Sequence, residues 1–253
     1  MMLQYIEAEW KKAKKFQAIF ISLIFLAISS FIALGIYFSN REILEDGTQS
    51  LVLWGQLTFY YSQVLFAPMV AILTALIFMP EFDRKTLSML KANNISISNL
   101  VKSKILVSFV LLIPVQIMLY AVYLSSMAVA HIPMDQSVFM NLKWMMIAMI
   151  GSIPLVILQF FICVKTRNFG ETVGIAALGA MAGFVILFIN ENLSYIFPYS
   201  LPMIAFRSRK LIDFSQLEIL LFLLVCSVYS IIFYLLTKRE LMMSNDRDRK
   251  SVV

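Results

Sequence analysis

Apolar and polar residues alternate along this chain in long blocks rather than in short periods. Six blocks contain no Asp, Glu, Lys or Arg: residues 16–38, 51–79, 105–130, 144–164, 172–189 and 219–237. A helix needs roughly 20 residues to cross a hydrocarbon core ~30 Å thick, and each block has about that length. Transmembrane barrels instead alternate apolar and polar residues in strands of ~10 residues. The pattern predicts an all-α integral membrane protein with six transmembrane helices in one domain, residues 1–253.

Composition agrees with this fold class. Hydrophobic residues make up 60% of the 253-residue chain, and the mean hydropathy is +0.84, whereas soluble domains are roughly 45–50% apolar. The first block, 16–38, follows four lysines and could be mistaken for a signal peptide. It is longer than the ~7–15 apolar residues of a signal peptide and lacks a small-residue cleavage site. We therefore interpret it as a retained helix.

The segment before the first block, residues 1–15, is amphipathic. Leu3, Ile6 and Trp10 lie on one side of a helical projection, and the lysines lie toward the other. Tryptophan with lysine is typical of a helix that lies in the membrane interface. We expect an interfacial helix here, although a simple topology anchor would have the same composition.

The basic residues predict an orientation. Most of the 21 Lys and Arg residues lie in 1–15, 80–104, 165–169 and 237–253. The excess of positive charge in cytoplasmic loops therefore places both termini and the loops 80–104 and 165–169 in the cytoplasm. The net charge of +6 is dispersed over short loops, so no nucleic-acid partner is expected.

The longest external loop, 190–214, departs from the charge pattern because it contains Arg207, Arg209 and Lys210. It is rich in aromatic residues, and Pro198 and Pro202 lie within it. This composition favours a re-entrant or interfacial segment over a loop in free solvent.

The polar stretch 80–104 lies between two apolar blocks, and its first part, 81–92, has helical spacing. Phe82, Thr86, Met89 and Leu90 share one face, and two asparagines then interrupt the pattern. A charged, partly apolar helix at this place is a candidate docking element at the membrane surface. An ordinary solvated loop is the alternative interpretation.

Uncharged polar and small residues lie inside the predicted spans. Four glutamines could line a translocation path, although amides in membrane helices more often bond to a neighbouring helix: Gln56, Gln63, Gln116 and Gln159. Four glycines in two small-xxx-small patterns predict close helix packing in the fifth span: Gly170, Gly174, Gly179 and Gly183.

Motifs for enzymatic chemistry are missing from the sequence. It has no phosphate-cradling G-x-x-x-x-G-K-[ST] loop, no H-E-x-x-H and no G-x-S-x-G, and its single histidine is His131. Cys163 and Cys226 both lie in predicted helices and indicate no disulfide framework or metal site. No Asp, Glu, Lys, Arg or His lies inside the six blocks, which argues against a proton- or sodium-coupled carrier. A permease driven by a partner protein is the simplest interpretation.

Over essentially its whole length the chain resembles the membrane subunits of type-2 ABC transporters (ABC-2 permeases), in particular the small subunits of lantibiotic-immunity and toxic-peptide exporters. Those subunits combine an amphipathic N-terminal helix, six spans and a cytoplasmic loop between the second and third spans. Glu81, Thr86, Leu87 and Leu90 resemble the family pattern where this loop begins, with Lys85 where glycine is common. The segments Ala8-Glu9-Trp10-Lys11 and Pro198-Tyr199-Ser200-Leu201-Pro202 are also similar.

The resemblance implies a function and a set of partners. It implies a bacterial plasma-membrane exporter of amphipathic, antimicrobial or toxin peptides, with a second permease subunit, identical or related, and membrane lipids around both. ATP and Mg²⁺ would bind to separate cytoplasmic ATP-binding subunits, and this chain would hold no cofactor or metal and have no catalytic residue. Segment 81–92 would be the coupling helix that contacts an ATPase subunit, through Glu81, Phe82, Asp83, Arg84, Lys85, Thr86, Leu87 and Leu90.

Two other classes of function stay open at this point. One is a membrane-embedded enzyme, which would need a nucleophile and base or a carboxylate cluster inside the bundle. The other is a sensor or assembly subunit that transports nothing. Co-purification with an ATPase would favour the permease, whereas turnover of a substrate by the chain alone would favour the enzyme.

Overall fold

The computed structural model describes residues 2–45, 47–83, 89 and 96–250, and in this part of the chain it contains helices and no strand. The predicted all-α fold is confirmed, with six helical segments long and apolar enough to cross a membrane. The elements are α1 (Met2–Lys12), α2 (Lys15–Ser39), η1 (Arg41–Ile43), α3 (Gln49–Phe59), the π-helical η2 (Tyr60–Leu65), α4 (Phe66–Asp83), α6 (Ile97–Val129), α7 (Gln136–Thr166), α8 (Phe169–Ile189), α9 (Glu191–Ser194), α10 (Leu201–Ala205) and α11 (Gln216–Lys250).

Several helices extend beyond the apolar blocks that predict them. α6 begins at Ile97, so the basic residues Lys102 and Lys104 lie within a helix and not in the loop assigned to 80–104. α11 continues to Lys250, so residues 238–250, which the sequence predicts to be part of a charged cytoplasmic tail (238–253), are helical. A charge marks where an apolar block ends but does not end a helix, because lysine and arginine are good helix formers.

The second span is a single rod with a π-helical turn in its middle. α3, η2 and α4 follow one another without a break, and η2 directly precedes the turn that contains Pro68. Proline cannot donate to the carbonyl four residues earlier, and its ring clashes with that carbonyl in a regular α-helix. The wider turn relieves this conflict and leaves Tyr61, Ser62 and Gln63 buried.

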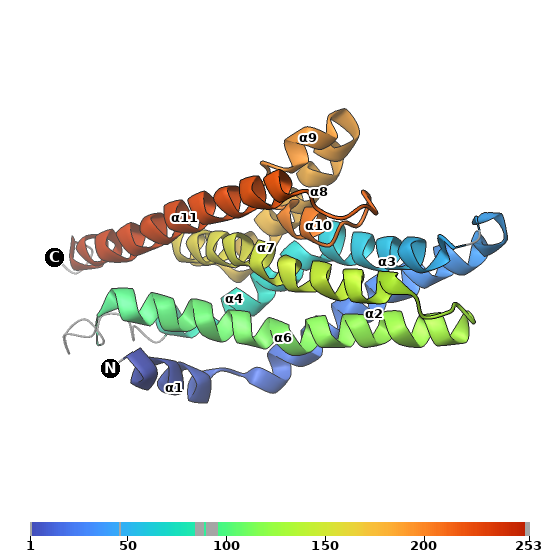
Figure 1. The fold of residues 1–253 in the computed structure, drawn as a ribbon. Helices are drawn as coiled ribbons and strands as arrows, with labels where there is room; N and C mark the ends of the chain where they lie inside the picture. The colour runs from blue at the N-terminus through green and yellow to red at the C-terminus, as the bar shows by residue number, and fades with distance from the viewer. Residues whose placement is uncertain (1, 46, 84–88, 90–95, 251–253) are drawn as a thin grey trace.

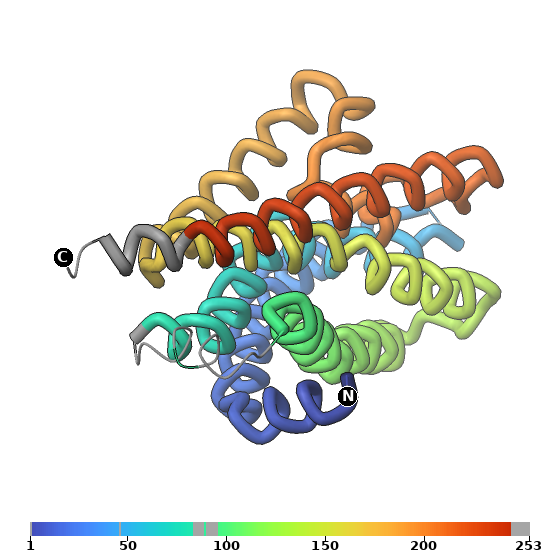
Figure 2. The backbone as a smooth tube through the Cα atoms, turned by 90° about the vertical axis from the view of Figure 1, so that its left-hand side faces the viewer, coloured from blue at the N-terminus to red at the C-terminus, as the bar shows by residue number. Residues whose placement is uncertain are grey.

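The bundle is built around α4 and α7. Both helices bury most of their surface, and α7 packs against α4, α6, α8, α10 and α11. Figures 1 and 2 show α2, α6, α8 and α11 arranged around these two. The outer helices α2, α8 and α11 expose long apolar side chains such as Phe31, Phe188 and Leu220. A soluble protein would not leave so much apolar surface in water, so these faces fit a lipid environment.

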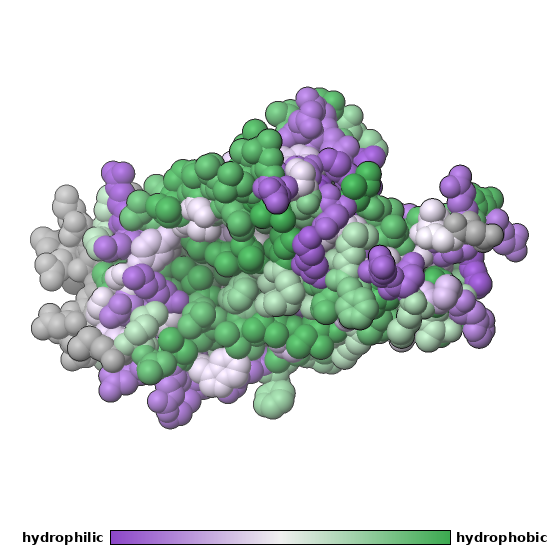
Figure 3. Space-filling model, in the orientation of Figure 1, coloured by the Kyte–Doolittle hydropathy of each residue, from purple (hydrophilic) through white to green (hydrophobic). Residues whose placement is uncertain are grey.

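The two ends of the bundle differ in what they hold. Figure 1 shows both chain termini at one end, together with the last residues of α4 and the first of α6. We call this the terminal end. The short connections around η1 and between α6 and α7 lie at the opposite end. Figure 3 shows hydrophobic surface over the middle of one face, with hydrophilic residues toward both ends.

The long connection between α8 and α11 folds back onto the bundle. All five residues of α10 are buried, and α10 packs against α7 and η2. Tyr199, Ser200 and Phe206 on either side of α10 are buried as well. Residues 198–208 therefore belong to the packed interior, which agrees with their apolar, proline-containing sequence, whereas most of α9 and of residues 209–213 is exposed.

Candidate functional site

Four charged residues meet at the terminal end, where α1, α4 and α6 come together: Glu9, Lys12, Glu81 and Lys104. We call them the buried ion cluster. The Lys104 ammonium donates to Glu9 Oε2 at 2.6 Å and to Glu81 Oε1 at 3.0 Å, and also to the Ile77 carbonyl at 3.1 Å. Lys104 is 1% exposed, and Glu9 and Glu81 are each 4% exposed. The cluster therefore joins three segments that lie far apart in the sequence.

The charges of the buried ion cluster balance. Lys12 lies near both carboxylates, at 3.4 Å from Glu9 and 3.5 Å from Glu81, and half of its side chain is exposed. Desolvation would lower the pKa of Lys12, but the carboxylates of Glu9 and Glu81 outweigh it, so the pKa is raised. Two carboxylates thus face two amines. Removing one member of such a buried set leaves an uncompensated charge, which is costly.

Helical spacing explains how the cluster assembles. α1 turns Glu9 toward α6, whereas Leu3 on another side of α1 is exposed. Glu81 lies one turn after Ile77 in α4, so its carboxylate and the Ile77 carbonyl point to the same ammonium. The Lys104 ammonium also lies 5.4 Å from the centre of the Phe78 ring. A cavity of about 270 Å³ adjoins the cluster.

The structure places only part of the predicted coupling segment. Glu81 turns inward to Lys104, while Phe82 is half-buried, with its ring 5.2 Å from that of Phe78 and 5.2 Å from the guanidinium of Arg167. Asp83 is the last residue of α4. The other predicted contacts lie outside the described residues: Arg84, Lys85, Thr86, Leu87 and Leu90. The role of this segment in ATPase coupling stays a prediction.

Two of the four predicted path glutamines lie near the adjacent residues Tyr199 and Ser200. Gln159 on α7 donates to the Tyr199 hydroxyl at 3.3 Å, and Gln63 in η2 donates to the Ala180 carbonyl of α8 at 3.2 Å. Both are fully buried, and neither amide oxygen has a hydrogen-bond partner among the described residues. This region between η2, α7 and α8 therefore has acceptors that the described part of the chain does not use.

The other two glutamines lie elsewhere. Gln116 is buried in α6, and neither atom of its amide group has a partner in the described part of the chain. Gln56 is half-buried beside Ser208 and Arg209, in a pocket of about 310 Å³. The structure thus does not bring all four into one path.

The four predicted packing glycines also separate into two pairs. A Cβ at Gly179 would lie 2.4 Å from the Tyr199 ring, and one at Gly183 would lie 2.7 Å from Ser200 Oγ and 2.8 Å from Gln63 Nε2. A Cβ at Gly174 would meet nothing within 4 Å, and one at Gly170 only a neighbouring asparagine side chain. α8 therefore approaches its neighbours closely at Gly179 and Gly183, where it contacts the folded-back segment around Tyr199 and the π-helical turn η2.

A second charged group, near the start of α11, was not anticipated from sequence. Arg207 is 1% exposed, with its guanidinium 3.7 Å from the centre of the Phe214 ring, and it donates to Glu218 at 2.6 Å. Asp213 accepts from Lys143 and from the Trp144 indole. Burial would raise the pKa of Asp213, but these hydrogen bonds outweigh it and lower the pKa. These contacts tie the folded-back segment to α7 and α11.

The buried ion cluster could have been anticipated only in part. Lys104 directly precedes an apolar block, and ionisable residues at such depth are normally paired. Nothing in the sequence indicates that its partners are Glu9, 95 positions earlier, and Glu81. Within the described residues, no group of three His, Cys, Asp or Glu side chains could hold a metal ion.

Comparisons with known proteins agree with this architecture. The family model described as "ABC-2 family transporter protein" matches residues 5–183, which is more than half of the chain and includes the whole buried ion cluster and the four spans through α7. No curated protein and no solved structure matches the chain. The chain belongs to the ABC-2 transporter family, and it is a multi-pass membrane permease component of an ABC transporter.

Proposed function

We propose that this chain is the membrane-spanning subunit of an ATP-driven exporter that moves an amphipathic peptide, such as an antimicrobial or toxin peptide, out of a bacterial cell. The terminal end would face the cytoplasm, in keeping with its basic residues. Separate ATP-binding subunits, which hold ATP and Mg²⁺, would dock there. A second permease subunit, identical or related, would complete the path beside the exposed apolar faces.

The buried ion cluster is the observation that best supports ATP-driven movement. It fastens the end of α4, which leads directly into the predicted coupling segment, to α1 and α6. A push on this segment would therefore move α4 together with its neighbours instead of fraying its last turn. The same rod continues through η2 to Gln63, so movement at the terminal end would reach the polar region around Tyr199.

The coupling step can be tested by Phe82→Ala. Phe82 lies at the end of α4 against Phe78 and Arg167, so its loss should loosen the link between docking and α4 while leaving the ion cluster in place. The reconstituted complex of Phe82→Ala with its ATPase should assemble normally but lose most of the peptide-stimulated ATP hydrolysis. Phe139→Ala, at an exposed site in the first turn of α7, is the matched control. If peptide stimulated ATP hydrolysis in Phe82→Ala as strongly as in the wild type, Phe82 would have no role in coupling.

The proposed peptide substrate is supported by the chemistry around Tyr199. The unused amide oxygens of Gln63 and Gln159 are fully buried here, and they would accept hydrogen bonds from peptide N–H groups once movement of the helices opens this region. The aromatic side chains around them suit apolar side chains of a peptide. ATP-dependent accumulation of a fluorescent amphipathic peptide in inside-out proteoliposomes would test it. Transport of a lipid dye with no transport of the peptide would contradict the peptide assignment but not ATP-driven transport.

A further inference from the structure

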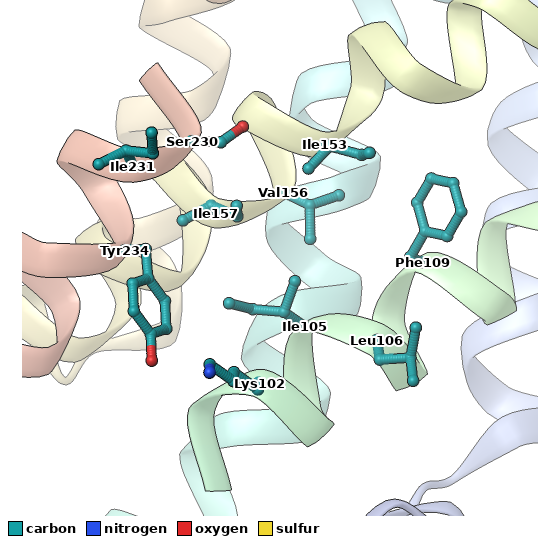
Figure 4. A pocket seen from close by; sticks show the side chains of 10 residues that line it. All are labelled: Lys102, Ile105, Leu106, Phe109, Ile153, Val156, Ile157, Ser230, Ile231 and Tyr234. Carbon is teal, nitrogen blue, oxygen red and sulfur yellow. The ribbon is translucent and has the colours of Figure 1, made fainter. Parts of the chain in front are cut away.

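An apolar groove runs between α6, α7 and α11 on the outer surface of the bundle, away from the buried ion cluster. Its volume is about 480 Å³. α6 lines it with Ile105 and Phe109, α7 with Ile153 and Ile157, and α11 with Ile231. Figure 4 shows these side chains around a shared space, with Lys102 and Tyr234 together at one end and Phe109 and Ile153 toward the other.

The polar end of the groove carries a positive charge. Lys102 is an exposed lysine whose ammonium lies 6.0 Å from the centre of the Tyr234 ring, and no carboxylate pairs with it in the described part of the chain. The Tyr234 hydroxyl shares a hydrogen bond of 2.7 Å with Ser98 Oγ. These groups lie near the start of α6, at the terminal end of the bundle. The groove is thus cationic at the membrane surface and apolar toward the membrane centre.

The groove continues along α11 as a second hollow of about 300 Å³, which shares Ile153 and Ile231 with the first and extends to Leu223. From Tyr234 to Leu223 is eleven residues, or ~16 Å at the helical rise of 1.5 Å per residue. One leaflet of a ~30 Å hydrocarbon core is ~15 Å deep. The combined groove therefore has about the length of one acyl chain in one leaflet.

The lining chemistry distinguishes an acyl chain from an extended peptide. An extended polypeptide in the groove would need partners for its backbone N–H and C=O groups, because in lipid only a helix or a closed barrel satisfies them internally. Among the residues that line the two hollows below Lys102 and Tyr234, the hydroxyls of Ser227 and Ser230 already donate to backbone carbonyls of α11. An acyl chain requires no such partners.

We propose that this groove is a binding site for one anionic phospholipid, with an acyl chain between α6, α7 and α11 and the headgroup phosphate on Lys102 and the Tyr234 hydroxyl. The lipid fills the opening that α6 and α11 leave between them and fastens α11, the least buried of the six spanning segments. The site does not depend on the transported substrate or on the ATPase.

The test uses the full chain in nanodiscs of phosphatidylcholine that contain a trace of phosphatidylglycerol with a photoreactive acyl chain. Cross-links should map to the stretches of α6, α7 and α11 that line the groove, and unlabelled phosphatidylglycerol should compete about fivefold better than added phosphatidylcholine. Lys102→Gln should abolish this preference. Lys165→Gln, which removes another exposed lysine over an aromatic ring at the same end, should keep it.

A second pair of variants tests the acyl-chain part of the site. Ile231→Trp fills the groove and should reduce total cross-linking severalfold, whereas Ile232→Trp adds the same bulk to a neighbouring exposed position and should not. The proposal would be overturned if the two lipids competed equally, or if Lys102→Gln and Lys165→Gln had the same lipid preference. Cross-links spread evenly over the outer helices would overturn it as well. Displacement of the probe by an amphipathic peptide would also overturn it.

Discussion

At the residue scale, the least expected feature of this protein is a lysine that is almost completely removed from solvent. Lys104 is stabilised by the Glu9 carboxylate of α1 and by the Glu81 carboxylate and the Ile77 carbonyl of α4. Burial of charge is tolerated only when such partners are present. By contrast, the pair of Lys11 and Glu7 on α1 is largely exposed and contributes little to stability.

Lys104→Met should therefore destabilise the fold by about 3–5 kcal/mol, because Glu9 and Glu81 remain buried without their main partner. Thermal unfolding in detergent would show this as a large fall in Tm. Lys11→Met, the exposed control, should change the free energy of unfolding by less than ~0.5 kcal/mol. Adding Glu9→Gln and Glu81→Gln to Lys104→Met should restore much of the lost stability, because no unpaired carboxylate then remains buried. Equal Tm values for Lys104→Met and Lys11→Met would contradict this account.

Two glycines of α8 provide a second comparison between single residues. Gly179→Ala places a methyl group against the Tyr199 ring and should cost about 1–3 kcal/mol of stability. Gly174→Ala, five residues earlier in the same helix, meets nothing within 4 Å and should be neutral or slightly stabilising. The measurement is again thermal unfolding of the purified chain. A Gly179→Ala variant as stable as Gly174→Ala would show that the folded-back segment does not pack here.

At the scale of elements, α1 combines two different attachments. Leu3 and Trp10 are exposed and suit the membrane interface, whereas Glu9 is buried against α4 and α6. A helix of eleven residues is only marginally stable alone. Its position on the bundle thus depends on a few side-chain contacts, and that of Glu9 with Lys104 is the most buried of them.

Glu9→Gln should release α1 from the bundle, because a neutral amide binds the Lys104 ammonium much less strongly than a carboxylate does. Backbone amides of Met2–Lys12 should then exchange with solvent deuterium faster, while those of α7 stay protected. Glu7→Gln changes the same residue type at an exposed position and should leave exchange in α1 unaltered. Unchanged protection in Glu9→Gln would mean that the membrane alone holds the helix.

At the scale of the whole molecule, both termini, the end of α4 and the start of α6 share one end of the bundle (Figure 1). From the charge distribution we predict that this end faces the cytoplasm. The basic residues Arg207, Arg209 and Lys210, which weaken the charge pattern, lie in the folded-back segment, where Arg207 is buried and paired. Lys210 is exposed but pairs with Glu218, and the exposed Arg209 lies 6.0 Å from the centre of the Phe188 ring. Two of these three basic residues are thus paired with a carboxylate of the protein.

Cysteine labelling in intact cells tests this orientation. In a chain with Cys163→Ala and Cys226→Ala, both of which replace buried thiols, Ile43→Cys should react with a membrane-impermeant maleimide from outside. Met89→Cys, also at an exposed position, should react only after the membrane is permeabilised. The reverse result would invert the topology and place the predicted coupling segment outside the cell.

The sequence by itself determined the fold class, the number of spans and the charge asymmetry of the loops. These follow from composition over stretches of ~20 residues, because a helix in lipid must hydrogen-bond its own backbone N–H and C=O groups and present apolar side chains to the lipid. Only the tertiary structure decided that Lys104 meets Glu9 and Glu81, that Tyr199 fills the space beside Gly179, and that α6 and α11 leave a groove below Lys102. Each of these depends on how far helices are rotated and shifted relative to one another, and side-chain packing between segments distant in the chain sets those quantities.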